Sequence, residues 1–531
     1  MTGRENEDER RSFASRTPVN DNPDKVVYRR GFVTRHQVTG WRFVMRRIAS
    51  GVALHDTRML VDPLRTQTRA VLMGILLVIT ALVGCFVFSL IRPNGSAANN
   101  SVLADRSTAA LYVKVGDQLH PVLNLTSARL IVGRSVNPTT VKSSELDKFP
   151  RANLIGIPGA PERMVQNTAK DANWTVCDAV SGAATGIKVI AGAPDSSGAR
   201  AAALSAGHAV LVRNATSTWM LWDGRRSRID LADHAVTGAL GLGSDIPAPR
   251  PIAAGLFNAI PEAPRLSAPA IQDAGSPPRF SLPVSAPVGA VVEAHALDST
   301  SDPSAHAMLY YAVLPDGLQP ISPVLAAILR NSNSYGLDQP PRLGADQVAK
   351  LPVSRMLDTT RYPDQRISLV DAARDPVTCV HWSKPAGATA NSLTLLTGSA
   401  LPVPEAVRTE DLVGAATGGT ASRVALTPGT GYFTATVGQN SASPAAGSLY
   451  WVSDTGVRFG VENEANEGGT NMPAKTAEVL GLNPPPTPIP WSVLSLFAPG
   501  PTLSRADALL AHDGLAPDTR PGRTAAQGEN R

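Results

Sequence analysis

Residues that could carry out chemistry are few and scattered in this sequence. No G-x-x-x-x-G-K-[ST] phosphate loop occurs, and the glycine-rich run at 414–420, GAATGGT, lacks the lysine that would reach a phosphate. Neither the G-x-S-x-G of serine hydrolases nor the H-E-x-x-H of zinc proteases is present. His295 and His306 flank a loop-like run, where hydrolysis would need a positioned nucleophile and base. We therefore expect no catalytic, metal-ligating or cofactor-binding residue, with ATP as the alternative ligand.

One segment is long and apolar enough to cross a membrane. Residues 70–91, AVLMGILLVITALVGCFVFSLI, carry no charge, and as a helix they would span about 33 Å against a hydrocarbon core of about 30 Å. The run is too long, and starts too far from Met1, for a cleavable signal peptide. A helix buried in a protein core is the alternative, and we predict a single uncleaved membrane anchor.

Positive charge is concentrated before this span. Of the 531 residues, positions 1–69 hold 14 Lys or Arg and 8 Asp or Glu, whereas the rest carry a net charge of −1. Because positive residues stay in the cytoplasm, the N-terminus should be cytoplasmic and residues 92–531 should face outward. This outer region has no basic excess, so we expect no nucleic acid as a partner.

The outer region contains two cysteines, Cys177 and Cys379, while Cys85 lies within the span. An oxidising compartment and an even number of cysteines predict a disulfide between the two. By chain entropy, closing so long a loop would stabilise the fold by at most roughly 5 kcal/mol. Two buried free thiols are the alternative, whereas a zinc site is excluded because the paired-ligand spacing is missing.

A basic amphipathic helix is predicted before the span, over residues 36–53. Spacings of three and four place five apolar residues on one stripe and leave three arginines off it. Such a helix could lie on anionic lipid or dock onto a cytoplasmic partner, and the alternative is a helix packed inside a small domain. The stripe is Val38, Trp41, Met45, Ile48 and Val52, and the candidate docking residues are Trp41, Met45, Ile48, Arg42, Arg46 and Arg47.

A short pattern occurs four times after the span: an aromatic-rich strand, a turn with glycine, and a second strand. Apolar and polar residues alternate around each turn, which predicts a β-hairpin. The copies are LYVKVGDQLHPV (111–122), TWMLWDGRRSRI (218–229), LYYAVLPDGLQPI (309–321) and LYWVSDTGVRFGV (449–461). A helix-like segment follows each, namely VKSSELDKF, LADHAVTGALG, ISPVLAAILRN with Ser322 as N-cap, and MPAKTAEVLGL ended by Gly481.

The segments that end these repeats indicate a duplication. The first and third repeats end alike, as do the second and fourth, and one cysteine lies between the members of each pair. Strand-like stretches around the cysteines, WTVC…IKVIAGA and RISLV…VTCVHW…SLTLLTG, could form a shared central sheet. The predicted fold class is α+β: a single-pass anchor and an elongated outer region of four small α/β repeats around a β-rich central domain, with pseudo-two-fold symmetry.

The expected domains follow from these boundaries. In chain order they are a disordered arm (1–35), the amphipathic helix region (36–69), the transmembrane helix (70–91), repeat 1 (92–165), the first segment of the central domain (166–210), repeat 2 (211–280), repeat 3 (281–355), the second segment of the central domain (356–440), repeat 4 (441–511) and a disordered tail (512–531). An aromatic residue stands near the start of each hairpin segment: Tyr112, Trp219, Tyr310 and Tyr450. These side chains could bind sugar, but aromatic residues in such positions more often form the core of their own hairpins.

Several motifs, in order, resemble the EccB family of type VII (ESX) secretion systems. They are VTGWRFVMRRI…LHDTRMLVDPL before the span, LADRSTAALYVKVGDQLHPVLNLTSARLIVG and VKSSEL…IGIPGAP after it, and WSVLSLFAPGPTLSRADALLAHD at the end. The resemblance runs from about Pro23 to Asp513. The arm RRSFASRTPVNDNPDKVVYRRGFVTRH is most similar to the branch linked to iron and zinc homeostasis.

The resemblance implies a structural core subunit that supports protein export across the bacterial inner membrane. It implies the partners EccC (an FtsK-like ATPase), EccD, EccE, other EccB copies and the mycosin protease, besides membrane lipid, and a periplasmic location for residues 92–531. EccB proteins are also labelled ATPases, but no Walker motif is present to receive that role. An ATP-hydrolysing component and a periplasmic receptor that binds the cell wall, with peptidoglycan as its ligand, are therefore the alternatives.

Overall fold

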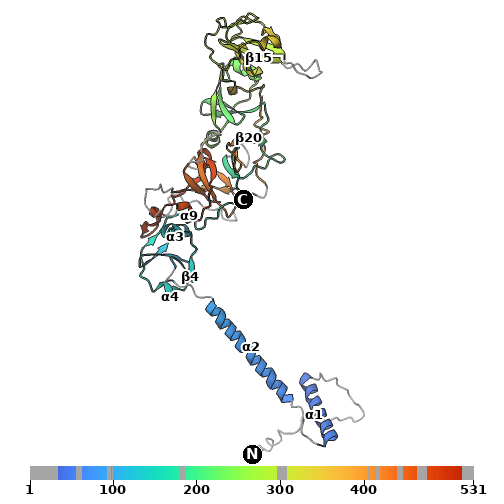
Figure 1. The fold of residues 1–531 in the computed structure, drawn as a ribbon, viewed down its shortest axis with the longest axis vertical. Helices are drawn as coiled ribbons and strands as arrows, with labels where there is room; N and C mark the ends of the chain where they lie inside the picture. The colour runs from blue at the N-terminus through green and yellow to red at the C-terminus, as the bar shows by residue number, and fades with distance from the viewer. Residues whose placement is uncertain are drawn as a thin grey trace, which may run out of the picture. The chain divides into compact units, whose positions relative to one another are not determined.

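The computed structural model describes residues 34–55, 63–91, 97, 100–179, 186–295, 308–404, 407–413, 419–438, 447–462 and 475–516 (Figure 1). The chain divides into two compact units, Met1–Pro93 and Asn94–Arg531. His306, most of the glycine-rich run at 414–420, nearly all of the predicted N-terminal arm and most of the predicted tail lie outside the described residues.

The first unit contains two helices, α1 (Arg35–Leu54) and α2 (Pro63–Ile91). A capping box fixes the start of α1: Thr34 Oγ1 accepts from the backbone of Gln37, whose side chain accepts from the Thr34 N–H. α2 begins at a proline, which suits the first helical position because its missing N–H would have no partner there. Within it, Gln67–Phe88 is the one stretch of the described residues that is long and apolar enough to cross a membrane.

The four predicted hairpins of the second unit are all present. Antiparallel pairing joins their strands within the predicted segments, and glycine lies at each tight turn. In the second hairpin Asp223 and Gly224 both have positive φ, 43° and 70°, as a two-residue turn of type I′ requires. The strands are β2 (Leu111–Val115) and β3 (Gln118–Val122), β10 (Ser217–Trp222) and β11 (Arg225–Ile229), β15 (Met308–Leu314) and β16 (Gly317–Ile321), and β24 (Leu449–Val452) and β25 (Val457–Val461).

Each hairpin belongs to a larger sheet with the same topology. A preceding strand pairs antiparallel with the hairpin, and a later short strand pairs parallel with that first strand. The first strands are β1 (Val102–Asp105), β9 (His208–Asn214), β14 (Val291–His295) and β23 (Tyr432–Val437), and their parallel partners are β4 (Thr139–Val141), β12 (Arg250–Pro251), β17 (Arg342–Leu343) and β26 (Thr487–Pro490). β9 and β23 therefore begin in stretches that the sequence assigned to the central domain.

The far side of each hairpin also carries a parallel partner. β5 (Leu154–Ile155), β13 (Glu262–Leu266) and β27 (Ala498–Pro499) pair with the last hairpin strands of the first, second and fourth sheets. In the third sheet a single bridge, Leu318 to Val353, takes this place. β28 (Ala511–His512) adds antiparallel to β5, so His512, placed at the start of the predicted disordered tail, belongs to a strand.

A helix follows each hairpin and covers its sheet. They are α3 (Leu125–Val132), α5 (His234–Leu240), α7 (Pro323–Ser332) and α9 (Thr476–Leu480). Ser322 caps α7 and Gly481 ends α9, as predicted. In the first repeat the prediction was wrong: VKSSELDKF contains only the short α4 (Ser143–Leu146), while α3 starts directly after the hairpin, capped by Asn124. The remaining short helices are α6 (Ala254–Ala259), α8 (Ala345–Val348), η1 (Thr359–Arg361), α10 (Trp491–Leu494) and α11 (Arg505–Ala508).

A seven-stranded sheet forms the centre, in the order β21-β22-β7-β6-β19-β20-β8. Its strands are β6 (Ala172–Ala179), β7 (Gly186–Ala191), β8 (Ala202–Ala203), β19 (Val377–Lys384), β20 (Ser392–Gly398), β21 (Glu410–Asp411) and β22 (Arg423–Ala425). The predicted shared sheet is therefore present, with one correction. The strand in RISLV, β18 (Ser368–Leu369), pairs with β9 of the second repeat rather than with the centre.

Three buried clusters join the repeats to one another and to the centre in a symmetric way. One combines the central sheet with the second and fourth repeats, through residues such as Trp382, Leu221 and Ile489. The other two join the first repeat to the fourth and the second to the third, with α3 packed on α9 and α5 packed on α7. Exchanging repeat 1 with 3 and repeat 4 with 2 preserves these contacts, in agreement with two duplicated halves. The fold class predicted from the sequence, mixed α/β repeats with a β-rich centre and one anchor, is confirmed.

Candidate functional site

The described residues contain no group of three or more His, Cys, Asp or Glu side chains that could hold a metal ion. His295 lies at the end of β14 and is exposed. Three other features are candidates for function: the disulfide at the centre, the surface of α1, and a cavity between the centre and the fourth repeat.

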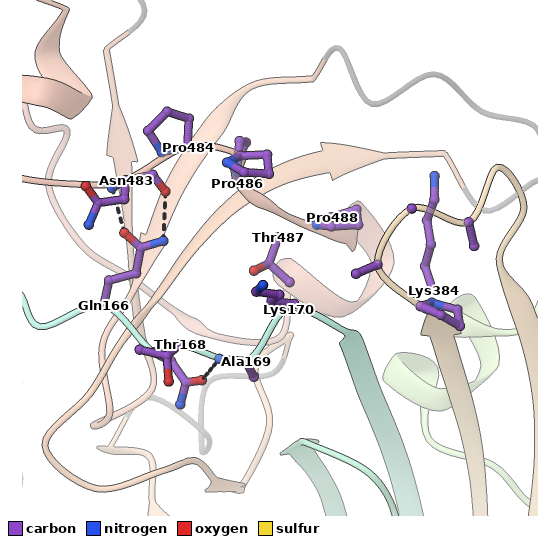
Figure 2. Close-up of a pocket in the computed structure, with 16 residues that line it drawn as sticks. Gln166, Thr168, Ala169, Lys170, Lys384, Asn483, Pro484, Pro486, Thr487 and Pro488 are labelled. Carbon is purple, nitrogen blue, oxygen red and sulfur yellow. Dashed lines mark hydrogen bonds between the residues drawn. The ribbon is translucent and has the colours of Figure 1, made fainter.

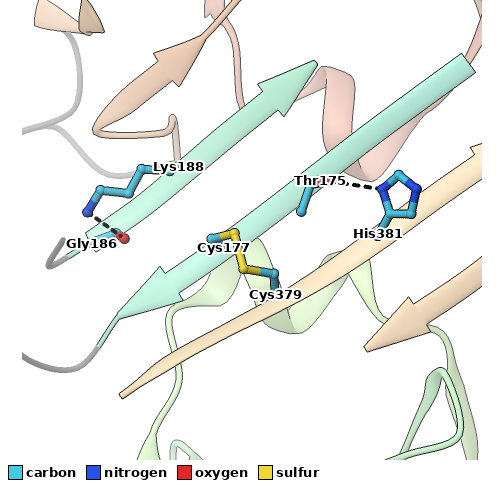
Figure 3. The surroundings of a disulfide bond; sticks show 6 residues. All are labelled: Thr175, Cys177, Gly186, Lys188, Cys379 and His381. Carbon is cyan, nitrogen blue, oxygen red and sulfur yellow. Dashed lines mark hydrogen bonds between the residues drawn. A yellow bond between two sulfur atoms is a disulfide. The ribbon is translucent and has the colours of Figure 1, made fainter. Parts of the chain in front are cut away.

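The disulfide joins two neighbouring strands in the middle of the central sheet (Figure 3). Cys177 of β6 and Cys379 of β19 are directly opposite each other in the antiparallel ladder, with Cα atoms 4.0 Å apart and an S–S bond of 2.06 Å. Both side chains are fully buried. The predicted pairing is confirmed, and it covalently joins the two duplicated halves.

Buried polar groups beside the disulfide are engaged within the sheet. The hydroxyl of Thr175 and the Nδ1 atom of His381 are 2.9 Å apart, and burial lowers the pKa of this histidine. The Lys188 ammonium, almost fully buried, donates to the carbonyl of Gly186 at 3.1 Å. Burial, and after it the nearby charge of Arg423, lowers the pKa of this lysine. The Thr175–His381 contact joins β6 to β19, whereas the lysine bond lies within β7.

A second buried polar group ties the end of repeat 2 to the central sheet. Asp178 of β6 accepts from the N–H of Ala253 at 2.7 Å, just before α6. Arg250 donates to the carbonyl of Asp375 at 3.2 Å. Burial lowers the pKa of Arg250 to about 10, against the opposing charges of Asp178 and Asp375. Their roles are structural.

The surface of α1 is apolar on one side and unburied along its whole length. None of its residues is buried, and Trp41 is 63% exposed, Ile48 55% and Met45 47%. Arg42, Arg46 and Arg47 are exposed too. The structure thus places the six predicted docking residues on one exposed helix. Their exposure agrees with docking onto a protein and with contact to lipid.

The aromatic residues that begin the hairpins pack mainly within their repeats. The guanidinium of Arg151 lies 4.7 Å from the ring centre of Tyr112, and the Trp219 ring meets Phe257 edge-on at 5.1 Å. Tyr450 contacts Trp491 at 6.1 Å, and Tyr310 packs against the cluster shared by repeats 2 and 3. This arrangement favours a core role over stacking on sugar.

A cavity of about 660 Å³ lies between three segments that are far apart in the sequence (Figure 2). They are residues 166–170 before β6, residues 384–388 from the last residue of β19 onward, and residues 483–488, which end within β26. Gln166 bridges two of them: its side-chain nitrogen donates to the carbonyl of Asn483 at 2.9 Å and its oxygen accepts from the Asn483 N–H at 2.7 Å. Sequence reasoning missed this cavity, because no single segment carries a recognisable motif.

A family model described as "Type VII secretion system ESX-1, transport TM domain B" matches residues 30–517. The chain belongs to this family, EccB. The prediction made from its motifs is therefore confirmed, and with it a core subunit of an ESX secretion complex in the inner membrane, with one candidate span near the N-terminus and a periplasmic region.

Similar proteins agree over the whole length. The chain is 72% identical to the "ESX-3 secretion system ATPase EccB3" of Mycobacterium tuberculosis (strain ATCC 25618 / H37Rv), over 97% of this chain and 96% of that protein. It is 63% identical to the protein of the same name from Mycolicibacterium smegmatis, over 99% and 100%. Both relatives are EccB3 proteins, and they match the branch that the N-terminal arm of the sequence predicted.

Two solved structures share the fold. EccB in an intact ESX-5 inner membrane complex has a TM-score of 0.71 and 36% identity, over 94% of this chain and 99% of that chain. An EccB3 dimer from an ESX-3 core complex has a TM-score of 0.68 and 60% identity, over 78% and 100%. These EccB proteins occur in inner membrane complexes and as dimers.

Proposed function

We propose that this EccB chain is a non-catalytic organiser of an ESX secretion complex. It holds EccC, EccD, EccE and other EccB copies together at the inner membrane, with the mycosin protease as an outer partner. Energy for export comes from EccC, because phosphoryl transfer needs phosphate and Mg²⁺ ligands for which this sequence offers no motif. Dimeric EccB3 and EccB in the ESX-5 complex support the role, and the link of this branch to iron and zinc homeostasis stays a prediction.

One observation carries the proposal: the apolar stripe of α1 is exposed. A helix that leaves Trp41, Met45 and Ile48 in water loses the roughly 1.5–3 kcal/mol that burying each large apolar side chain contributes. Trp and Arg are also the residues most enriched in the energetic centres of interfaces. We therefore assign this stripe to a cytoplasmic surface of another subunit.

Replacing both Trp41 and Ile48 with alanine should lower the recovery of EccC, EccD and EccE with this chain at least tenfold. The substitutions remove two exposed anchors without touching a buried residue, so the periplasmic region should keep its stability. The measurement is affinity purification from native membranes, followed by quantitative mass spectrometry.

The matched control replaces Phe43 and Leu54, two apolar residues that are 39% and 55% exposed. At about 100° per residue they lie on the opposite side of the helix from Trp41, so their loss should leave recovery unchanged. Full recovery of the partners with the Trp41 and Ile48 variant, together with weaker binding to anionic vesicles, would assign the stripe to lipid and refute docking.

ATP hydrolysis is the second candidate, since the names of the relatives contain the word ATPase. It would require a phosphate-binding arrangement unlike a Walker motif.

A further inference from the structure

The cavity between residues 166–170, 384–388 and 483–488 has the size and charge of a ligand site. Its volume of about 660 Å³ falls in the range of about 300–1,000 Å³ that is usual for ligand sites. Its lining includes Lys170 and Lys384 but no aspartate or glutamate. Within the described residues of the chain, neither lysine takes part in an ion pair. The cavity is therefore positive.

Proline rings supply much of the remaining wall. Residues 483–488 read Asn-Pro-Pro-Pro-Thr-Pro, and Pro385 faces the same space. Prolines present apolar rings and carbonyl oxygens but no N–H donors. Such a wall suits a chain with apolar surface and its own N–H groups, whereas a small inorganic anion would leave the rings unused.

Contacts behind the wall hold the three segments in place. Gln166 fixes Asn483 through two hydrogen bonds, and the indole N–H of Trp174 donates to the carbonyl of Pro488 at 2.9 Å. The nearest carboxylate in sequence, Asp171, accepts from the N–H of Ala386 at 2.8 Å, and so supports the β19–β20 turn. Figure 2 shows the Gln166–Asn483 bonds and Lys384 on opposite sides of the cavity. A ligand would thus meet a preformed site.

We propose that this cavity binds an extended acidic peptide segment of a partner protein, with carboxylates at Lys170 and Lys384 and the backbone along the prolines. This binding site is a function in addition to the organiser role proposed above. Because its walls come from the centre and from the fourth repeat, bound peptide would fasten the two together.

The test measures fluorescence anisotropy of a labelled acetyl-(Pro-Glu)₄ amide with the purified full-length chain in detergent. Saturable binding that weakens with salt is expected, because exposed ion pairs are screened. Replacing both Lys170 and Lys384 with glutamine should weaken binding about tenfold. The matched control replaces Lys148 and Lys350, which form ion pairs on other surfaces and should not affect it.

Two further arms separate the cavity from simple charge attraction. The Ala386→Trp variant places bulk in the cavity without changing charge and should also weaken binding about tenfold. The neutral acetyl-(Pro-Gln)₄ amide should bind at least tenfold less well, and inorganic phosphate should compete poorly. Absence of saturable binding, equal binding of the neutral peptide, or full binding by either cavity variant would each overturn the proposal. Efficient competition by phosphate would instead assign the site to small anions.

Discussion

Replacing Cys177 with serine should lower the free energy of unfolding of the periplasmic region by about 2–5 kcal/mol. The disulfide closes a loop between positions 202 residues apart, and its loss gives the unfolded chain far more freedom. Serine also leaves a hydroxyl group in a fully buried position beside a free thiol, which adds a desolvation cost. The disulfide joins the two duplicated halves, so unfolding should begin in the central sheet.

Denaturation followed by tryptophan fluorescence reports on this sheet, because Trp174 and Trp382 are buried in β6 and β19. Replacing both Cys177 and Cys379 with alanine separates the loss of the cross-link from the cost of the hydroxyl. Cys85→Ser, in the membrane helix, is the control and should leave the periplasmic transition unchanged. Peptide mapping that finds both periplasmic thiols free in the native protein would contradict the account.

Arg458→Ala should destabilise the fourth repeat by about 2–4 kcal/mol. One nitrogen of its guanidinium donates to three carbonyl groups where α10 ends, those of Leu494, Ser495 and Phe497, at 3.2, 2.7 and 2.6 Å. Burial of this group lowers the pKa of Arg458, as expected for a cation partly removed from water. Without the arginine, these three carbonyls lose their charged donor.

The second repeat provides an internal replicate of this contact. Arg226 donates to the carbonyls of Phe257 and Ile260 where α6 ends, in the same place relative to its hairpin. Arg226→Ala should therefore have a similar effect, and Arg163→Ala, at an exposed position, should have little. Thermal unfolding of the four proteins gives the comparison; equal stability of Arg458→Ala and the wild type would contradict a structural role for this arginine.

Local signals in the sequence predicted the elements of the fold that form locally. The hairpins are marked by Asp/Gly turns between alternating strands, and α7 by Ser322 and Pro323. The short parallel partners of the first strands, such as β4 and β12, have no such mark, because parallel pairing joins segments far apart in the chain. β18 was misplaced for the same reason, since a strand of two residues does not specify its neighbour.

The candidate sites also divide into those that local sequence predicts and one that depends on distant segments. The disulfide was predictable from the number and compartment of the cysteines, and the stripe of α1 from helical spacing. The cavity was not, because residues 317 apart, Gln166 and Asn483, meet there and neither belongs to a motif. The equivalence of Arg226 and Arg458 also became visible only once the short helices were placed against their hairpins.

ATP turnover by the purified chain tests the central claim most directly. The full-length protein, separated from EccC by repeated chromatography, is assayed with Mg²⁺ and ATP, beside a sample that still contains EccC. The organiser role predicts hydrolysis that follows EccC from fraction to fraction and disappears with it. A saturable, stoichiometric rate that survives purification, and is abolished by a point mutation in this chain, would contradict it.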